Sequence, residues 1–263
     1  MPVLLIAEHD NSNLKVLTLN AINAASKIDS DIHVLVAGNE CESVSKEVAA
    51  VPLVKKVLQS ESANYENYLA ENLTPLVVKL AEKYTHIIAS ANTFGKNFMP
   101  RVAALLDTSQ VSDIIKIKNP DTFIRPIYAG NAFATVKSND KKKCITIRPT
   151  SFDPAPTSGG KAQIEKIEAA DTPNISKFIK KEETKSERPE LGTARVVISG
   201  GRGMQSGDNF KLINVINAAS KINSDIHVLV AGSGCENVSK EVGLMVTHFF
   251  LSLLLTVAKA FPA

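Results

Sequence analysis

A glycine-rich turn that carries one arginine is the segment of this chain best suited to chemistry. Residues 196–203 read Val-Val-Ile-Ser-Gly-Gly-Arg-Gly, and helical spacing resumes at Asp208. A strand, a glycine turn and a helix aim backbone N–H groups and a helix dipole at a phosphate. Glycines let the backbone approach a ligand, and an arginine adds a fixed charge with planar donors. The pattern therefore predicts a phosphate-binding turn at Gly201, Arg202 and Gly203.

A structural interpretation of the same turn stays open. Ser206 stands where the dinucleotide fingerprint G-x-G-x-x-G has its third glycine, and the segment is not a P-loop. A glycine turn that only joins a strand to a helix would look the same.

Histidines that could act as acids or bases have no catalytic partners near them in the sequence. His9 and Asp10 end the first apolar run, where α/β proteins bind ligands, but no second group of catalytic type is close. His33 and His227 lie inside apolar runs, which favours a structural role. The chain has no metal-ligand or nucleophile motif, so redox chemistry would need a cofactor.

Cysteine spacing also argues against a disulfide framework or a zinc site. None of the three cysteines forms a C-x-x-C pair, and one repeats another. We expect small buried thiols in a reducing compartment; they are Cys41, Cys144 and Cys235.

The composition is that of a soluble globular protein, with 44% hydrophobic and 22% charged residues. A net charge of +3 gives no reason to expect nucleic acid as a partner.

The N-terminus has no signal or transit pattern, so we expect a cytoplasmic protein. Residues 244–258 are mostly apolar but shorter than the roughly 18–20 residues that span a bilayer. We expect no membrane anchor there, but a buried helix or sequence read out of frame after a rearrangement.

Strands and helices should alternate up to residue 106. This alternation predicts a parallel sheet with right-handed crossovers. Four short strands then follow without helices, and Lys141–Lys143 occupy a turn between two of them, either solvated or binding an anion. The fold class is thus α/β, with a nucleotide-binding-like parallel sheet and an antiparallel extension. The predicted strands are 3–7, 32–37, 54–58, 86–89, 114–117, 124–128, 132–136 and 144–147, and the helices are 14–28, 43–51, 66–84 and 94–106.

Proline and glycine content marks the domain boundaries. We expect an α/β domain at residues 1–152, a linker at 153–192 and a second, incomplete Rossmann-like βαβ unit at 193–263. Residues 214–242 repeat residues 20–48 with 24 of 29 positions identical. Solenoid repeats are shorter and more numerous, so a single distant copy indicates a rearranged gene.

Five specific motifs follow one another along the chain: Phe94-Gly-Lys-Asn-Phe-Met-Pro-Arg101, Ser112-Asp-Ile, Ile127-Tyr-Ala-Gly-Asn-Ala132, Ser186-Glu-Arg-Pro-Glu-Leu191 and Ser199-Gly-Gly-Arg-Gly203. Over about residues 1 to 213, the chain resembles the electron transfer flavoprotein α subunit in these motifs. The resemblance implies an electron carrier, not a catalyst with its own substrate. It implies FAD, a β subunit that packs on the first domain, donors such as acyl-CoA dehydrogenases of fatty acid oxidation, and a quinone oxidoreductase as acceptor. It places Arg202, with Gly201 and Gly203, at the FAD.

The chain departs from that family after Leu212. The family continues with an arginine-containing segment and with G-Q-T-G, G-I-S-G-x-x-Q-H and D-Y-G segments around the flavin; here the repeated block and the apolar tail stand instead. One arginine does not hold a dinucleotide, because such sites need several converging polar groups. Three interpretations therefore remain: a working flavoprotein subunit, a flavin-free protein that binds the β subunit, and a nucleotide-binding α/β module.

Overall fold

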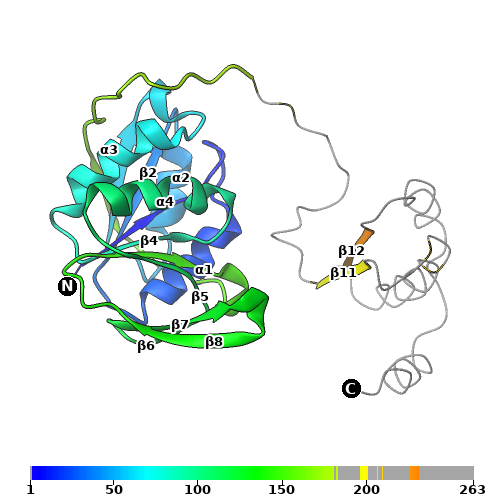
Figure 1. Ribbon diagram of the computed structural model, residues 1–263. Helices are drawn as coiled ribbons and strands as arrows, with labels where there is room; N and C mark the ends of the chain where they lie inside the picture. Colours follow the sequence, from blue (N-terminus) through cyan, green and yellow to red (C-terminus); the bar gives the residue numbers. More distant parts are fainter. Residues whose placement is uncertain are drawn as a thin grey trace. The chain divides into compact units, whose positions relative to one another are not determined.

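The computed structural model describes residues 2–180, 182, 196–200, 206, 209 and 226–230. The chain divides into two compact units, residues 1–181 and 182–263, which we call unit 1 and unit 2 (Figure 1). Within the described residues, no helix is long and apolar enough to cross a membrane.

Unit 1 is built on a seven-stranded sheet in the order β10-β3-β2-β1-β4-β9-β5, and every neighbouring pair is parallel. The central strands are buried on both faces, as their continuous apolar runs predict. The predicted α/β fold class is confirmed. The strands are β1 Val3–Ile6, β2 Ile32–Gly38, β3 Lys56–Glu61, β4 His86–Ser90, β5 Gln110–Ile114, β9 Lys143–Ile147 and β10 Gln163–Lys166.

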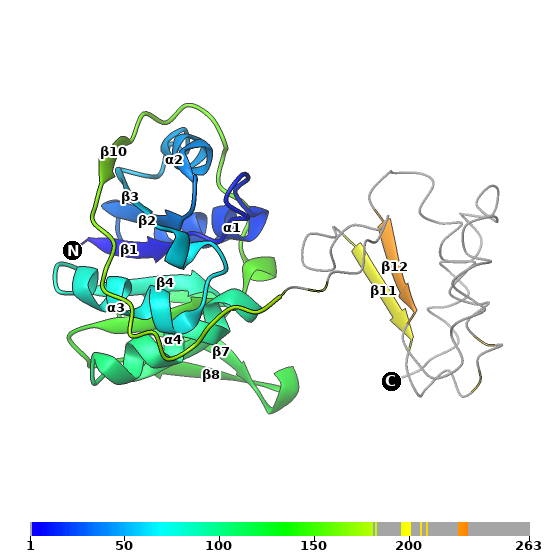
Figure 2. The same ribbon diagram turned by 90° about the horizontal axis from the view of Figure 1, so that it is seen from above.

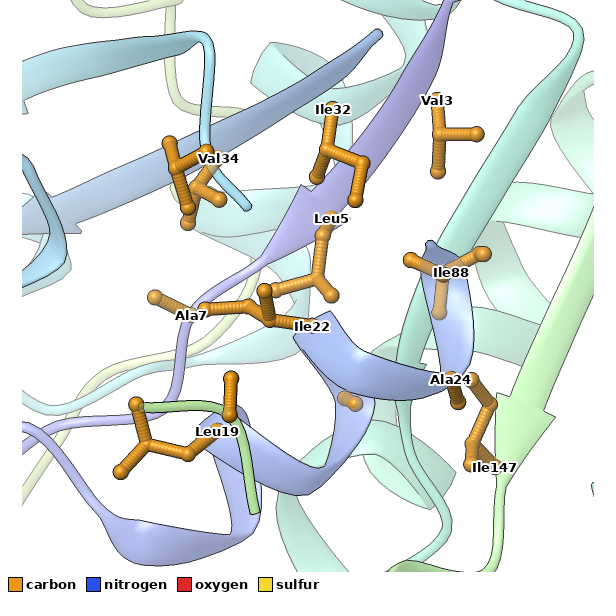
Figure 3. Packing of buried hydrophobic residues seen from close by; sticks show 14 of the residues in the cluster. Val3, Leu5, Ala7, Leu19, Ile22, Ala24, Ile32, Val34, Ile88 and Ile147 are labelled. Carbon is orange, nitrogen blue, oxygen red and sulfur yellow. The ribbon is translucent and has the colours of Figure 1, made fainter. Parts of the chain in front are cut away.

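Two helices cover each face of this sheet (Figure 2). Helices α1 (Val16–Ala25) and α2 (Glu42–Ala49) pack on one apolar cluster, and α3 (Ala70–Ala81) and α4 (Thr93–Leu105) pack on the other. In Figure 3, Ile22 of α1 lies beside Leu5 of β1. Short 3₁₀ turns lie at Ala63–Tyr65 and Pro149–Ser151, and a left-handed turn lies at Tyr128–Gly130.

A three-stranded antiparallel sheet, in the order β6-β7-β8, forms the predicted extension. Its strands are Lys116–Asn119, Thr122–Ile127 and Ala132–Lys137. Phe123 of β7 is fully buried in the cluster beneath α1 and α2, which fixes the extension to the main sheet.

The structure differs from the sequence prediction at β9. The short strand at 144–147 was expected beside the antiparallel strands, but β9 runs parallel between β4 and β5. All five of its residues are buried. A run buried on both faces belongs inside a parallel sheet.

The predicted linker, residues 153–192, also begins later than its composition suggests. Strand β10 pairs with β3 at the sheet edge. Further on, the backbone N–H of Ala170 donates to the Tyr65 hydroxyl at 2.9 Å, and the Ser176 hydroxyl donates to Glu71 at 3.1 Å. Residues up to about 176 therefore pack on unit 1.

Unit 2 contains strands β11 (Val196–Gly200) and β12 (Ile226–Val230), which pair in parallel. Val196 lies opposite Ile226, just as Val3 lies opposite Ile32 in unit 1. A parallel pair is what a βαβ unit requires. The helix expected from Asp208 and the apolar tail lie outside the described residues.

Candidate functional site

The carboxyl edge of the sheet between β1 and β4 is where this topology would place a ligand. The chain moves from β1 to β2 on one side and returns to β4 on the other, which makes a topological switch point. The residues after β1 and β4 therefore decide whether a ligand fits.

His9, just after β1, is held as a neutral, buried ring. It is 2% exposed. The Tyr68 hydroxyl lies 2.8 Å from its Nδ1, and the backbone N–H of Asn11 donates to the same nitrogen at 3.1 Å. Burial lowers the pKa of His9 to about 4, against the smaller opposing effects of the Ala37 carbonyl and Asp10. His9 thus accepts hydrogen bonds within the fold at neutral pH.

Side chains of the chain itself fill the space at the end of β2. A Cβ on Gly38 would lie 2.4 Å from Asn11 Oδ1 and 2.7 Å from His9 Cε1, so only glycine fits here. The Tyr68 ring packs edge-on against both His9 and Phe94.

The N-terminus of α4 faces a carboxylate. Asn92 caps this helix by accepting from the backbone N–H of Gly95 at 3.2 Å, and its amide donates to Glu8. A helix N-terminus attracts an anion, and here the Glu8 carboxylate lies beside it. A bound phosphate would meet that negative charge, so this edge is poorly suited to a nucleotide.

The predicted cofactor turn lies only partly within the described residues. Ser199 and Gly200 end β11, opposite Leu229 and Val230 of β12. Gly201, Arg202 and Gly203 lie outside the described residues, so their role stays a prediction.

Cys41, Cys144 and His33 have the structural roles predicted for them, whereas Cys235 lies outside the described residues and the role of His227 stays a prediction. Cys41 and Cys144 are buried free thiols. Burial raises their pKa to about 11 and about 12, which makes them poor nucleophiles. His33 Nδ1 lies 2.7 Å from the Tyr84 hydroxyl. Nowhere in the described part of the chain do histidine, cysteine and acidic side chains gather into a metal site.

The prediction that Lys141–Lys143 form a solvated turn is wrong for two of the three. Lys143 is buried, and its ammonium lies 3.0 Å from an Asp121 carboxylate oxygen. Lys142 donates to the Ala81 carbonyl at the end of α3. These lysines fix the β8–β9 connection to the sheet.

Sequence reasoning missed an exposed aromatic pair on the β7–β8 hairpin. Tyr128 and Phe133 are 80% and 64% exposed. Tyr128, Ala129 and Gly130 have φ values of 50°, 55° and 94°, a left-handed turn that is unusual outside glycine. We call Tyr128 and Phe133 the hairpin aromatics. The Tyr-Ala-Gly-Asn turn between two apolar runs was the signal for them.

Unit 1 is therefore a doubly wound α/β domain whose ligand edge is occupied by its own side chains. Residues 3–172 match the family described as "Electron transfer flavoprotein domain". That is more than half of the chain, so the chain belongs to the electron transfer flavoprotein family.

The curated relatives are α subunits. The electron transfer flavoprotein subunit alpha of Pseudomonas aeruginosa is 50% identical over 213 residues, which cover 81% of this chain and 69% of the relative. The mitochondrial subunit alpha of Dictyostelium discoideum is 51% identical over 226 residues, covering 80% and 64%. That of Bradyrhizobium diazoefficiens is 51% identical over 210 residues, covering 80% and 67%. The chain thus spans about two thirds of the length of these relatives, and belongs with the α subunits.

Proposed function

We propose that this chain acts as an electron transfer flavoprotein α subunit that binds a β subunit through unit 1. The observation that carries this proposal is the match of the family to residues 3–172, the part of the chain whose sheet is covered on both faces. Electrons would come from dehydrogenases such as those for acyl-CoA in fatty acid oxidation and pass to a quinone oxidoreductase. A cytoplasmic location stays a prediction.

The hairpin aromatics are our choice for the β-subunit contact. Large aromatic side chains are enriched at protein interfaces, and an exposed apolar pair on a stiff turn is costly without a partner. The turn is held in its left-handed conformation by the β7–β8 pairing, with Ile127 opposite Ala132. Such a pre-ordered tip loses little entropy on binding.

FAD fits the residues present only in part. A glycine turn after a parallel strand, with one guanidinium, suits a phosphate group. When bound, FAD supplies one-electron and two-electron transfer. Directly after Leu212, the repeated block stands where the family continues with the arginine-containing segment of its flavin site. We therefore propose weak FAD retention.

Co-expression with a β subunit from a related protein tests the proposal. We expect the two chains to co-purify, with visible flavin absorbance far below one FAD per complex. Failure to co-purify would overturn the β-binding function. Stoichiometric flavin would overturn the expectation of weak retention and support a complete carrier.

A pair of variants tests the docking surface. Tyr128→Ala with Phe133→Ala should reduce β-subunit binding by at least about tenfold, because aromatic anchors often contribute more than 1–2 kcal/mol each. Val16→Ala removes an exposed apolar side chain elsewhere on unit 1 and is the control. Equal binding by both variants would exclude the hairpin.

The nucleotide-binding alternative has its own test. The filled edge at Gly38 and the Glu8 carboxylate beside α4 predict negligible AMP or ATP binding at this edge of unit 1. Calorimetric titration with either nucleotide checks this, and micromolar affinity would favour the alternative.

A further inference from the structure

The chain carries a second version of residues 20–48, which form the last six residues of α1, all of β2 and α2 except its last residue. In unit 1, residues 20–48 fill a slot between β1 and β3. We propose that residues 214–242 of the same chain can fill this slot in place of residues 20–48. The chain then has two mutually exclusive ways to complete one sheet.

The strand in the middle of the copied block retains every residue that the slot requires. Residues 226–231 repeat Ile32–Ala37 without a change, and five of those six side chains are buried in unit 1. In unit 2 the copy also forms a strand, and Ile226 lies opposite a valine, as Ile32 does. The copied strand therefore keeps both the shape and the pairing register of β2.

Polar contacts around the slot would also be kept. The side-chain amides of Asn20 and Asn23 donate to the carbonyls of Phe152 and Asp153 at 2.6 and 2.8 Å. The copied block has asparagine at both places, residues 214 and 217. Its histidine at 227 matches His33, which pairs with the Tyr84 hydroxyl.

Three of the five substitutions between the copies are tolerated by the contacts they replace. Asp29 Oδ1 accepts from the Asp31 backbone N–H at 2.9 Å; the asparagine of the copy keeps an amide oxygen for this bond but lacks the negative charge of Asp29. Asn39 uses its backbone N–H toward Asn11, so a serine keeps that bond. The Ser43 hydroxyl donates to the Ser12 carbonyl, and an asparagine amide can donate as well.

The other two substitutions have opposite effects on how well the copied block would fit the slot. Ala21 is 1% exposed, and the valine at 215 would crowd the packed face of α1. Glu40 has a left-handed φ of 52°, and the glycine at 234 adopts that conformation without strain. Short connections to β1 and β3 favour residues 20–48 in the unaltered chain, since closing a longer loop costs more entropy.

The connection is long enough for the exchange. The Ser176 hydroxyl is bonded to Glu71 of unit 1. From there to residue 214 are 38 residues, which span up to about 125 Å when extended. A domain of this size has a radius of gyration of only about 16 Å.

A buried charge in one copy tests the exchange. Leu35 is fully buried on the α3 and α4 side of β2. In full-length Leu35→Asp, we expect residues 214–242 to enter the sheet, so that Cys41 loses its protection from alkylation. Cys144, in β9, should stay protected because the rest of the sheet is intact. Mass mapping after iodoacetamide treatment under native conditions reads both sites.

Controls separate exchange from simple unfolding. Leu229→Asp disables only the copy and should leave Cys41 and Cys144 protected. Leu35→Asp with Leu229→Asp disables both and should expose both thiols. If Leu35→Asp alone exposes Cys144 as fully as the double variant, the proposal is overturned. If the Leu35→Asp variant with protected Cys144 is a dimer by light scattering, the copied segment comes from a second chain. Exchange within one chain is then overturned.

Discussion

The same strand sequence occurs in two settings in this protein, as β2 and as β12. Strand β2 is paired on both sides, with β1 and β3. Among the described residues, β12 is paired only with β11. Residues Lys56–Glu61 follow the first copy and supply the next strand, whereas the apolar tail follows the second. The local sequence thus determines that a strand forms and how it is registered against its parallel neighbour.

The largest expected effect comes from the strands beside the two copies. Leu5 of β1 lies opposite Val34, and Ile198 of β11 lies opposite the equivalent Val228. Leu5→Ala should lower the free energy of unfolding of unit 1 by about 2–5 kcal/mol, because it leaves a cavity in a fully buried layer. Ile198→Ala should leave that unfolding transition unchanged.

Intrinsic fluorescence measures this difference in the full chain. The protein has no tryptophan, and its four tyrosines, Tyr65, Tyr68, Tyr84 and Tyr128, all belong to unit 1. Urea titrations followed by tyrosine emission therefore report unit 1 alone. Equal shifts for the two variants would mean that both units unfold together.

The next largest effect is expected in the pH dependence of the stability of unit 1. This dependence arises from His9, which lies outside the repeated residues 20–48. Its folded pKa of about 4 is below the unfolded value of 6.5, so the unfolded chain binds more protons between these pH values. This contribution to stability is complete above about pH 6.5 and is lost as the pH falls toward 4. The full loss is about 3 kcal/mol.

His9→Gln is the matched variant for this titration. It keeps a neutral polar side chain after β1 but has no proton to gain. Between pH 7.5 and 5, the urea midpoint of the native protein should fall more than that of the variant. Parallel pH profiles would show that protonation of His9, beside Tyr68 and Asp10, does not govern acid stability.

Sequence patterns predicted the regular parts of unit 1 because each element carries its own signal there. The apolar run at residues 3–7 and the helical spacing before residue 28 gave β1 and α1. The place of β9 could not be predicted, because a short apolar run has the same pattern beside an antiparallel strand as inside a parallel sheet. The sequence also did not predict that side chains of unit 1 fill the carboxyl edge of its sheet. Tyr68 reaches His9 across 59 positions, and no local pattern encodes that contact.

A smaller effect is expected where the copy places a larger residue. Ala21 faces the sheet beneath α1, and the copied block has valine at the equivalent place. Ala21→Val should destabilise unit 1 by about 1–3 kcal/mol through overpacking. Tyrosine-monitored urea unfolding tests this. No loss would show that the space below α1 accepts either copy equally.

The smallest expected effect has the opposite sign. Glu40, between β2 and α2, has a φ of 52°, which an L-residue with a side chain adopts at a cost, and the copied block has glycine there. Glu40→Gly should therefore stabilise unit 1 by about 1 kcal/mol or less, because relief of backbone strain exceeds the extra entropy of the unfolded glycine. Glu42→Gly, in the first turn of α2, is the control and should destabilise, since that residue is helical. If both variants destabilise unit 1 equally, the left-handed residue is not strained, and the glycine of the copy gives it no advantage in the slot.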